Sequence, residues 1–139
     1  DKVDVILSPA LGGVVVGYEM ARQLKVKAIF SERIDGKMIL RRDFKINKNS
    51  NVLIIEDVIT TGKSALECAK LVNEFEGNLI GYGCIIDRSN SNISISDKIV
   101  SQMQFNIKTF TKNNIPEDLK KIIPTKPGSR NLNKWLKKD

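Results

Sequence analysis

The sequence contains no histidine and only two cysteines, Cys68 and Cys84, among its 139 residues. Structural zinc sites take their ligands from cysteine and histidine, and a Ser-His-Asp triad takes its base from histidine. The composition therefore excludes a structural zinc centre and a histidine-based triad. Both cysteines fall in apolar stretches, which predicts buried thiols in a cytoplasmic protein.

Long apolar runs are also absent. No stretch approaches the roughly 20 apolar residues that a membrane-spanning helix needs, and no signal peptide is visible. Apolar residues make up 41% and charged residues 28% of the chain, as in ordinary globular proteins. We therefore predict one domain over residues 1–139, with no membrane partner. Asp1 stands next to a predicted strand without an initiator Met, so we expect the natural N-terminus to lie further upstream.

The net charge of +7 is unevenly distributed along the chain. Residues 31–48 carry six basic and three acidic side chains, and the C-terminal extension 112–139 carries eight basic and three acidic. Basic segments favour anionic partners, which leaves a phosphorylated small molecule or nucleic acid. For the extension, a lysine-rich solvated surface is an equally open interpretation.

Apolar runs alternate with helical patterns, which predicts an α/β fold with a mostly parallel sheet covered on both faces. Strands are predicted at residues 3–7, 28–31, 52–55 and 79–86. One or two more are predicted within 98–109, where the alternation of Phe105 and Ile107 suits an edge strand. Helices are predicted at residues 14–24 and 64–76, and a short helix is predicted to open at Pro116. In the first helix, the apolar residues Val16, Met20, Ala21 and Leu24 are expected to lie on one side. Ligands of such sheets bind beyond the carboxyl ends of the strands.

Residues 32–48 are predicted to form a basic β-hairpin. Asp35-Gly36 suits the turn, and apolar residues alternate from Met38 to Ile46. A weakly packed hairpin could close over a polyphosphate, although a merely solvated hairpin is the alternative. It carries, among its basic residues, Arg33, Lys37, Arg41, Arg42 and Lys45.

The stretch 51–75 combines a buried strand, two acids, a short loop and a helix. Glu56 and Asp57 end the strand, and Ser64 with Glu67 predicts a capping box at the helix start. Gly62-Lys63-Ser64 is no Walker A motif, because Asp57 stands where that motif needs glycine. A ribose phosphate suits this pattern: its hydroxyls can donate to the carboxylates while its phosphate lies at the helix N-terminus.

Residues 8–13, Ser-Pro-Ala-Leu-Gly-Gly, form a second glycine-containing loop between a strand and a helix. Such a loop can direct backbone N–H groups at an anion, although a plain tight turn is the alternative. A dinucleotide fingerprint is excluded, because the pattern G-x-G-x-x-G is absent.

The segment IIEDVITTGKS resembles the phosphoribosyl-pyrophosphate (PRPP) signature of type I phosphoribosyltransferases. PALGG resembles the family's pyrophosphate loop, and SERIDGKMILRRDFKI is similar to the mobile catalytic loop of a bacterial class of orotate phosphoribosyltransferases. IIDRSN and KPGSR also resemble that class. The resemblance covers Val3 to Arg130, loosely over 93–123. It implies the type I phosphoribosyltransferase fold with a hairpin flap, and we expect the N-terminal hood of that class to be missing from this chain.

The resemblance implies Mg²⁺-dependent transfer of phosphoribosyl from PRPP to orotate, giving orotidine 5′-monophosphate and diphosphate in pyrimidine biosynthesis. It implies catalytic roles for Glu56, Asp57 and Lys37, and orotate contacts from Thr60 and Arg88. The implied PRPP-binding residues are Arg33, Lys37, Glu56, Asp57, Val58, Ile59, Thr60, Thr61, Gly62, Lys63 and Ser64, with Ala10, Leu11, Gly12 and Gly13 as the diphosphate loop. Mg²⁺ would be bound mainly through PRPP, and a homodimer would share the flap between subunits.

Two alternatives stay open from the sequence. A purine or other-base phosphoribosyltransferase would share residues 56–64 but would need aromatic stacking and a lysine contact, and Arg88 disfavours it. A non-catalytic regulator that senses PRPP and binds nucleic acid is permitted by the basic extension. No separate nucleic-acid-binding domain is visible, so nucleic acid is not the expected partner.

Overall fold

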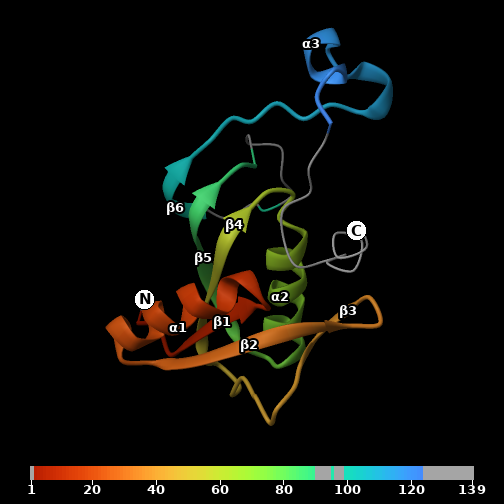
Figure 1. The fold of residues 1–139 in the computed structure, drawn as a ribbon. Coiled ribbons are helices and arrows are strands. Elements are labelled where there is room, and N and C mark those ends of the chain that lie inside the picture. Colours follow the sequence, from red (N-terminus) through yellow and green to blue (C-terminus); the bar gives the residue numbers. More distant parts are fainter. Residues whose placement is uncertain (1, 90–94, 96–98, 124–139) are drawn as a thin grey trace, which may run out of the picture. The chain divides into compact units, whose positions relative to one another are not determined.

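The computed structural model describes residues 2–89, 95 and 99–123 (Figure 1). The chain divides into two compact units, Asp1–Ile107 and Lys108–Asp139. The prediction of a single domain over 1–139 stays a prediction. The segment 126–130 that resembles the orotate class, and most of the basic extension, lie outside the described residues.

The first unit is built on a six-stranded sheet in the order β3-β2-β1-β4-β5-β6. Its elements are β1 (Val5–Pro9), α1 (Gly12–Leu24), β2 (Lys27–Ile34), β3 (Lys37–Leu40), β4 (Asn51–Ile59), α2 (Lys63–Glu74), β5 (Asn78–Asp87) and β6 (Ile99–Gln104). Every pairing is parallel except that of β2 with β3. From β1 the chain crosses to β2, whereas from β4 it crosses to β5 in the opposite direction. The predicted mostly parallel α/β sheet is confirmed.

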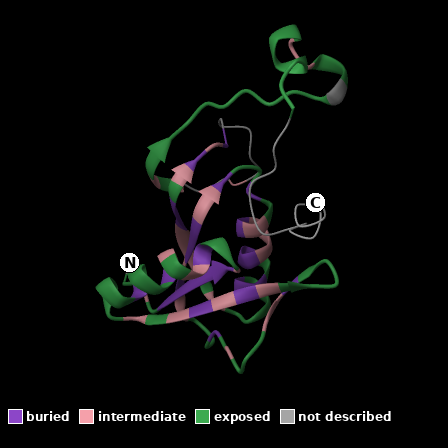
Figure 2. Ribbon diagram, in the orientation of Figure 1, coloured by how far each residue is buried: buried purple, intermediate pink, exposed green. Residues whose placement is uncertain are grey.

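Helices α1 and α2 cover opposite faces of this sheet. Ala21 of α1 packs with Ile6 and Ile55, whereas Val72 of α2 packs in the cluster that contains Leu7. Successive side chains of a strand point to opposite faces, so β1 and β4 supply both cores. Both strands are mostly buried, as Figure 2 shows. This explains why their sequences are continuous apolar runs.

Helix α1 approaches the sheet through small residues at a spacing of four. Gly13, Gly17 and Ala21 are its buried residues, and a Cβ at Gly17 would lie 3.0 Å from the Cβ of Ser8. Of the apolar residues expected on one side of the helix, Ala21 is buried. Met20 and Leu24 are 37% and 45% exposed, because the helix is turned so that its small residues face the sheet.

The predicted hairpin is present and its turn is the predicted one. Asp35 (φ 48°) and Gly36 (φ 81°) are both left-handed, as a two-residue hairpin turn with the correct twist requires. Strand β2 is longer than the predicted 28–31, and β3 ends at Leu40 rather than continuing to Ile46. The reason is that Arg42 and Asp43 adopt left-handed backbone angles, each with φ 58°, which interrupt an extended strand.

The predicted capping box at α2 is wrong. Gly62, left-handed at φ 72°, is the N-cap, and no side chain caps the helix. Ser64 lies inside the first turn, and Glu67 pairs with Arg33 of β2 instead. The N-cap of α2 therefore lies two residues earlier than the capping pattern indicates.

Beyond β5, the described residues contain one more strand and the predicted short helix. One strand, β6, follows within 98–109; Phe105 and Ile107 lie beyond its end, so their predicted alternation in an edge strand is wrong. In the second unit, a 3-10 turn at Lys112–Asn114 precedes α3 (Glu117–Lys120). Pro116 is the N-cap of α3 and two acids fill its first turn, which confirms the short helix predicted there.

Candidate functional site at the carboxyl ends of β1 and β4

The loops after β1 and β4 meet at the point where the sheet changes winding direction. The two strands are neighbours in parallel register, with Leu7 opposite Ile54. A Cβ added to Gly12 would lie 2.6 Å from Cγ and 2.7 Å from Oδ1 of Asp57. The start of α1, which follows the first loop, therefore touches Asp57 directly. This crevice is where ligands bind in open α/β sheets.

The acid pair lies within β4, which continues to Ile59 beyond the predicted strand end, and its two side chains are on opposite faces of the sheet. Glu56 is buried, 8% exposed, while Asp57 is half-buried against the start of α1. Burial, and secondarily the neighbouring charge of Asp57, raises the pKa of Glu56 to about 7. A carboxyl group with this pKa changes its charge near neutral pH, so it can both accept and donate hydrogen bonds to hydroxyl groups.

The loop after the acid pair is shaped for an anion. Thr60, Thr61 and Lys63 are exposed at the N-terminus of α2, and Thr61 Oγ1 accepts a 3.4 Å hydrogen bond from the Lys63 N–H. The left-handed Gly62 turns the chain into the helix. The first N–H groups of a helix have no intrahelical acceptor, and the helix dipole favours negative charge there.

Two residues of the implied PRPP set, Val58 and Ile59, lie at the end of β4 before this loop. The Ile59 side chain is 1% exposed and belongs to the core. Its contribution at the site comes from its backbone, because its carbonyl accepts a 2.8 Å hydrogen bond from the Arg88 N–H. Val58 is half-buried and is paired with Ile86 of β5.

Arg88 lies beside Thr60, because Ile59 is paired with Asp87 in the β4–β5 register. The Asp87 carboxylate accepts hydrogen bonds from the Ser89 N–H at 2.8 Å and the Gln104 amide at 3.4 Å. Within the described residues, the Nε of Arg88 is buried without a hydrogen-bond partner. Ser89 and Gln104, and not Arg88, therefore engage the Asp87 carboxylate.

The hairpin cations divide between the two faces of the sheet. Arg33 pairs with Glu67 of α2, and its Nη1 also donates a 3.0 Å hydrogen bond to the Gly36 carbonyl. Lys37 follows the turn and is exposed. The catalytic and PRPP-binding roles of Arg33 and Lys37 stay predictions. Glu67 is a partner of Arg33 that no sequence pattern indicates, because the two residues are 34 positions apart.

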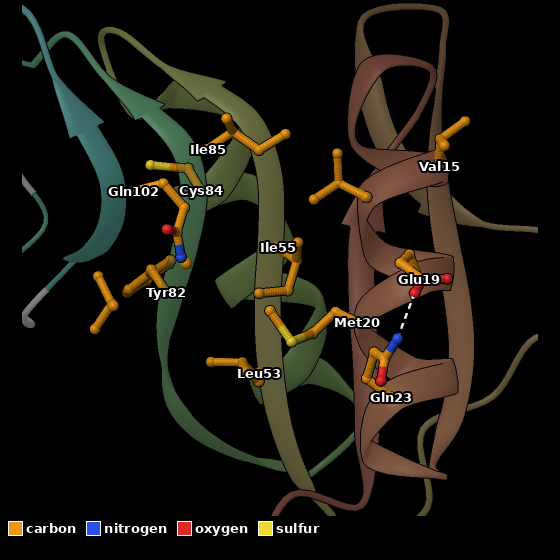
Figure 3. A pocket seen from close by; sticks show the side chains of 13 residues that line it. Val15, Glu19, Met20, Gln23, Leu53, Ile55, Tyr82, Cys84, Ile85 and Gln102 are labelled. Atoms are coloured by element: carbon orange, nitrogen blue, oxygen red, sulfur yellow. Dashed lines mark hydrogen bonds between the residues drawn. The ribbon is translucent and has the colours of Figure 1, made fainter.

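A cavity of about 610 Å³ lies elsewhere, between α1 and strands β4–β6 on the α1 face of the sheet (Figure 3). Its wall is mainly apolar, with Met20, Leu53 and Ile55 pointing into the space, and none of its described lining residues is basic. Such a surface does not suit a phosphorylated ligand, so we place the candidate site at the strand ends.

Among the residues that the structure describes, no helix is long and apolar enough to cross a membrane. Nor do these residues bring three histidine, cysteine, aspartate or glutamate side chains together as a metal-binding group.

The chain matches the family model "Phosphoribosyl transferase domain" over residues 1–121. It therefore belongs to the phosphoribosyltransferase family. Within that family its relatives include an orotate phosphoribosyltransferase from Caldanaerobacter subterraneus subsp. tengcongensis, 44% identical over 94% of this chain and 69% of that protein. Four further relatives of the same name are 37–43% identical. The predicted membership of the orotate phosphoribosyltransferases is confirmed.

Solved structures support the fold. Adenine phosphoribosyltransferase from Thermoanaerobacter pseudethanolicus superposes with a TM-score of 0.66, at 19% identity over 75% of this chain and 71% of that one. Orotate phosphoribosyltransferase from Aeropyrum pernix gives a TM-score of 0.60, at 17% identity over 74% and 61%. At these identities the likeness concerns the fold alone, and the predicted type I phosphoribosyltransferase fold is confirmed.

Proposed function

We propose that this chain carries the phosphoribosyl-transfer site of an orotate phosphoribosyltransferase acting in pyrimidine biosynthesis. The observation that carries the proposal is the register of β4 and β5, which places Arg88 beside Thr60 at the start of the phosphate loop. One ligand can then span a guanidinium and a helix N-terminus. Relatives of 37–44% identity that bear this name support the same function.

The roles of the residues follow from their chemistry. Glu56 and Asp57 accept hydrogen bonds from the ribose hydroxyls, and the backbone N–H groups of residues 60–64 bind the 5′-phosphate. Arg88 is half-buried, and its Nε has no hydrogen-bond partner among the residues that the structure describes. Its planar fork suits the carboxylate of orotate. Thr60, between these two parts, contacts the base.

The reaction breaks the bond between C1 of the ribose and the diphosphate oxygen, and it forms a bond from C1 to N1 of orotate. N1 loses its proton, and diphosphate leaves with the bonding electrons. Positive charge develops on the sugar in the transition state, where the carboxylates of Asp57 and ionised Glu56 stabilise it. Backbone N–H groups of the first loop from Leu11 to Gly13 bind the departing diphosphate beside Asp57, while the Ala10 N–H is donated to the Ser31 carbonyl.

The donor set fits Mg²⁺ bound through the substrate. Mg²⁺ is commonly held by one or two carboxylates together with substrate phosphates, and Asp57, which lies against the first loop, is the carboxylate that could join the substrate's diphosphate in holding it. The ion would neutralise charge on the diphosphate when bound. Arg33 and Lys37 of the hairpin would add positive charge on the same leaving group.

A homodimer that shares the hairpin between subunits is part of the proposal, as the resemblance implies. Sedimentation of the purified protein should give twice the monomer mass, and a monomer that is fully active would contradict it. A cytoplasmic location is also proposed. The free and buried thiols of Cys68 and Cys84 are consistent with a reducing compartment.

The decisive experiment follows the loss of orotate absorbance with PRPP and Mg²⁺, with adenine, hypoxanthine and uracil as competing bases. We expect consumption of orotate alone, and lost activity in Asp57→Asn because a ribose contact is removed. Consumption of a purine instead would favour the purine alternative, which shares residues 56–64. Salt-dependent binding of nucleic acid without turnover of any base would favour a regulator.

A further inference from the structure

The backbone on either side of Arg88 is bonded to both neighbouring strands. The Arg88 N–H donates to the Ile59 carbonyl of β4 at 2.8 Å, and the carbonyl of the preceding residue, Asp87, accepts the Phe105 N–H at 2.9 Å. Asp87 is the last residue of β5 and is paired with Ile59 on one side and with Gln104 of β6 on the other. The start of the turn that carries Arg88 is therefore fixed by strand register.

The Asp87 carboxylate holds the other side of this turn. Its Oδ1 accepts the Ser89 N–H at 2.8 Å, and Asp87 and Ser89 are both buried, each 7% exposed. An aspartate that accepts the N–H two residues further on closes a short turn through its side chain. Its Oδ2 accepts a 3.4 Å hydrogen bond from the Gln104 amide. The carboxylate thus joins the residue before Arg88 to the residue after it.

Asp87 shapes the turn without neutralising Arg88. The Nε of Arg88 is buried and has no hydrogen-bond partner within the described part of the chain. A buried donor without an acceptor is costly, and binding of an anion recovers that cost. A guanidinium that is already held in place also loses less side-chain freedom when the anion binds.

We infer that Asp87 is a positioning residue for the base. Its carboxylate fixes residues 87–89 so that the Arg88 fork meets the carboxylate of orotate, and Gln104 supports the Asp87 carboxylate from β6. This inference deepens the proposed function and rests on it for the contact between Arg88 and orotate. A binding group whose geometry is fixed by neighbouring hydrogen bonds binds its ligand more tightly than one that must first be ordered.

Removing the carboxylate should weaken the use of the base and leave PRPP unaffected. Asp87→Ala leaves the buried Ser89 N–H without its acceptor, so the KM for orotate should rise about tenfold. The KM for PRPP should change less than about twofold, because its 5′-phosphate lies at the N-terminus of α2. Asp87→Asn keeps an acceptor oxygen for the Ser89 N–H, and the Gln104 amide can turn to accept from the new NH₂ group. The KM of Asp87→Asn for orotate should therefore stay within about threefold of the unmodified value.

A double-mutant cycle separates positioning from a general loss of structure. In a protein that already carries Arg88→Met, Asp87→Ala should change the KM for orotate less than about twofold, because the group that Asp87 positions is gone. A merely structural role would give the same increase in both backgrounds. If Asp87→Ala does not fold, Gln104→Leu decides, since Gln104 is exposed. An increase of about two- to threefold in its KM for orotate alone would support the inference, and an unchanged KM would overturn it.

Asp4→Ala is the matched control. The Asp4 carboxylate accepts a 2.9 Å hydrogen bond from the Asn51 N–H where β4 begins, at the opposite end of that strand from the site. Its removal deletes a comparable bond between a side chain and the backbone. Asp4→Ala should lower the melting temperature without changing the KM for orotate.

The experiment measures the KM of each purified variant for orotate and PRPP, with uracil and adenine as competing bases and with the melting temperature of each variant. An unchanged KM for orotate in Asp87→Ala, equal increases in both KM values, or additivity with Arg88→Met would overturn the inference, while orotate consumption would leave the proposed function standing. Consumption of another base would refute orotate as the substrate, and non-additive effects on the KM for that base would still support the positioning role. A protein that consumes no base would overturn both.

Discussion

Gly12 and Asp57, 45 residues apart in sequence, lie in direct contact at the centre of the candidate site. The Oδ1 of Asp57 would be 2.7 Å from a Cβ placed on Gly12, closer than side-chain atoms pack. The contact connects the loop that we assign to diphosphate with the acid that we assign to ribose. A substitution in one loop therefore has consequences for the other.

Substitution Gly12→Ala should displace the Asp57 carboxylate and raise the KM for PRPP about tenfold, with the melting temperature little changed. The added methyl meets the end of a movable side chain rather than backbone. In a double-mutant cycle, Gly12→Ala should have no further effect once Asp57→Ala is present. Additive effects of the two substitutions would contradict the proposed coupling.

Substitution Glu56→Gln should stabilise the ligand-free protein at pH 8 by up to about 3 kcal/mol and leave it nearly unchanged at pH 4. The pKa of Glu56 is raised from 4.5 to about 7. Because the folded-state pKa is raised, the neutral carboxyl group contributes its full share to stability below pH 4.5. This contribution is lost as the pH rises through 7, where Glu56 must ionise in its buried position. Thermal melts between pH 4 and 8 measure the effect.

The matched control is Glu74→Gln, which removes an exposed carboxylate from α2. Its stability relative to the unmodified protein should not vary with pH in this way. A Glu56→Gln variant whose stability follows the unmodified protein at every pH would show that Glu56 is not forced to ionise in a buried position. The variant should also lose activity, since the charge that we assign to the transition state is removed.

Substitution Arg88→Met should raise the KM for orotate about tenfold or more, because a hydrogen-bonded charge contact is worth about 1.5–3 kcal/mol. The KM for PRPP should change less than twofold, since the 5′-phosphate lies at the N-terminus of α2. Arg88→Lys keeps the charge but not the two-pronged geometry, so its KM for orotate should be intermediate. Equal increases in both KM values would argue against a contact to the base.

The pair between Arg33 and Glu67 tests the role of Arg33 in PRPP binding. The side chains are 34% and 21% exposed, so the pair itself should contribute no more than about 1 kcal/mol to stability. Glu67→Gln and Arg33→Met should therefore destabilise the protein by similar small amounts. Only Arg33→Met should also raise the KM for PRPP. Equal kinetic effects would show that the pair supports the hairpin without a contact to substrate.

Substitution Gly62→Ala should cost about 1–2 kcal/mol in stability, because a side chain is forced into a left-handed conformation. It should also raise the KM for PRPP, since this residue turns the phosphate loop into α2. Gly81→Ala is the control: Gly81 has a φ of 150° in β5, pairs with Leu53, and lies away from the strand ends. Gly81→Ala should destabilise the protein without changing the KM for PRPP.

Local sequence determined the strands, the helices and the phosphate loop. Val52 to Ile55 are apolar because β4 is buried on both faces, and Asp35-Gly36 forms the predicted turn because both residues tolerate left-handed angles. The acid pair and the loop after it are consecutive in the chain, so their chemistry could be recognised from the sequence without knowledge of the fold. The same segment carried the resemblance to phosphoribosyltransferases, which the family match confirms.

Only the tertiary structure decided which distant residues meet. It places Asp57 against Gly12 and Arg88 beside Thr60 through strand register, and it gives the hairpin arginines their carboxylate partners on opposite faces. The raised pKa of Glu56 depends on burial that a sequence pattern does not measure. The physical reason is that periodicity and turn preference act between near neighbours, whereas a binding site is assembled from strand ends that only the order of the sheet brings together.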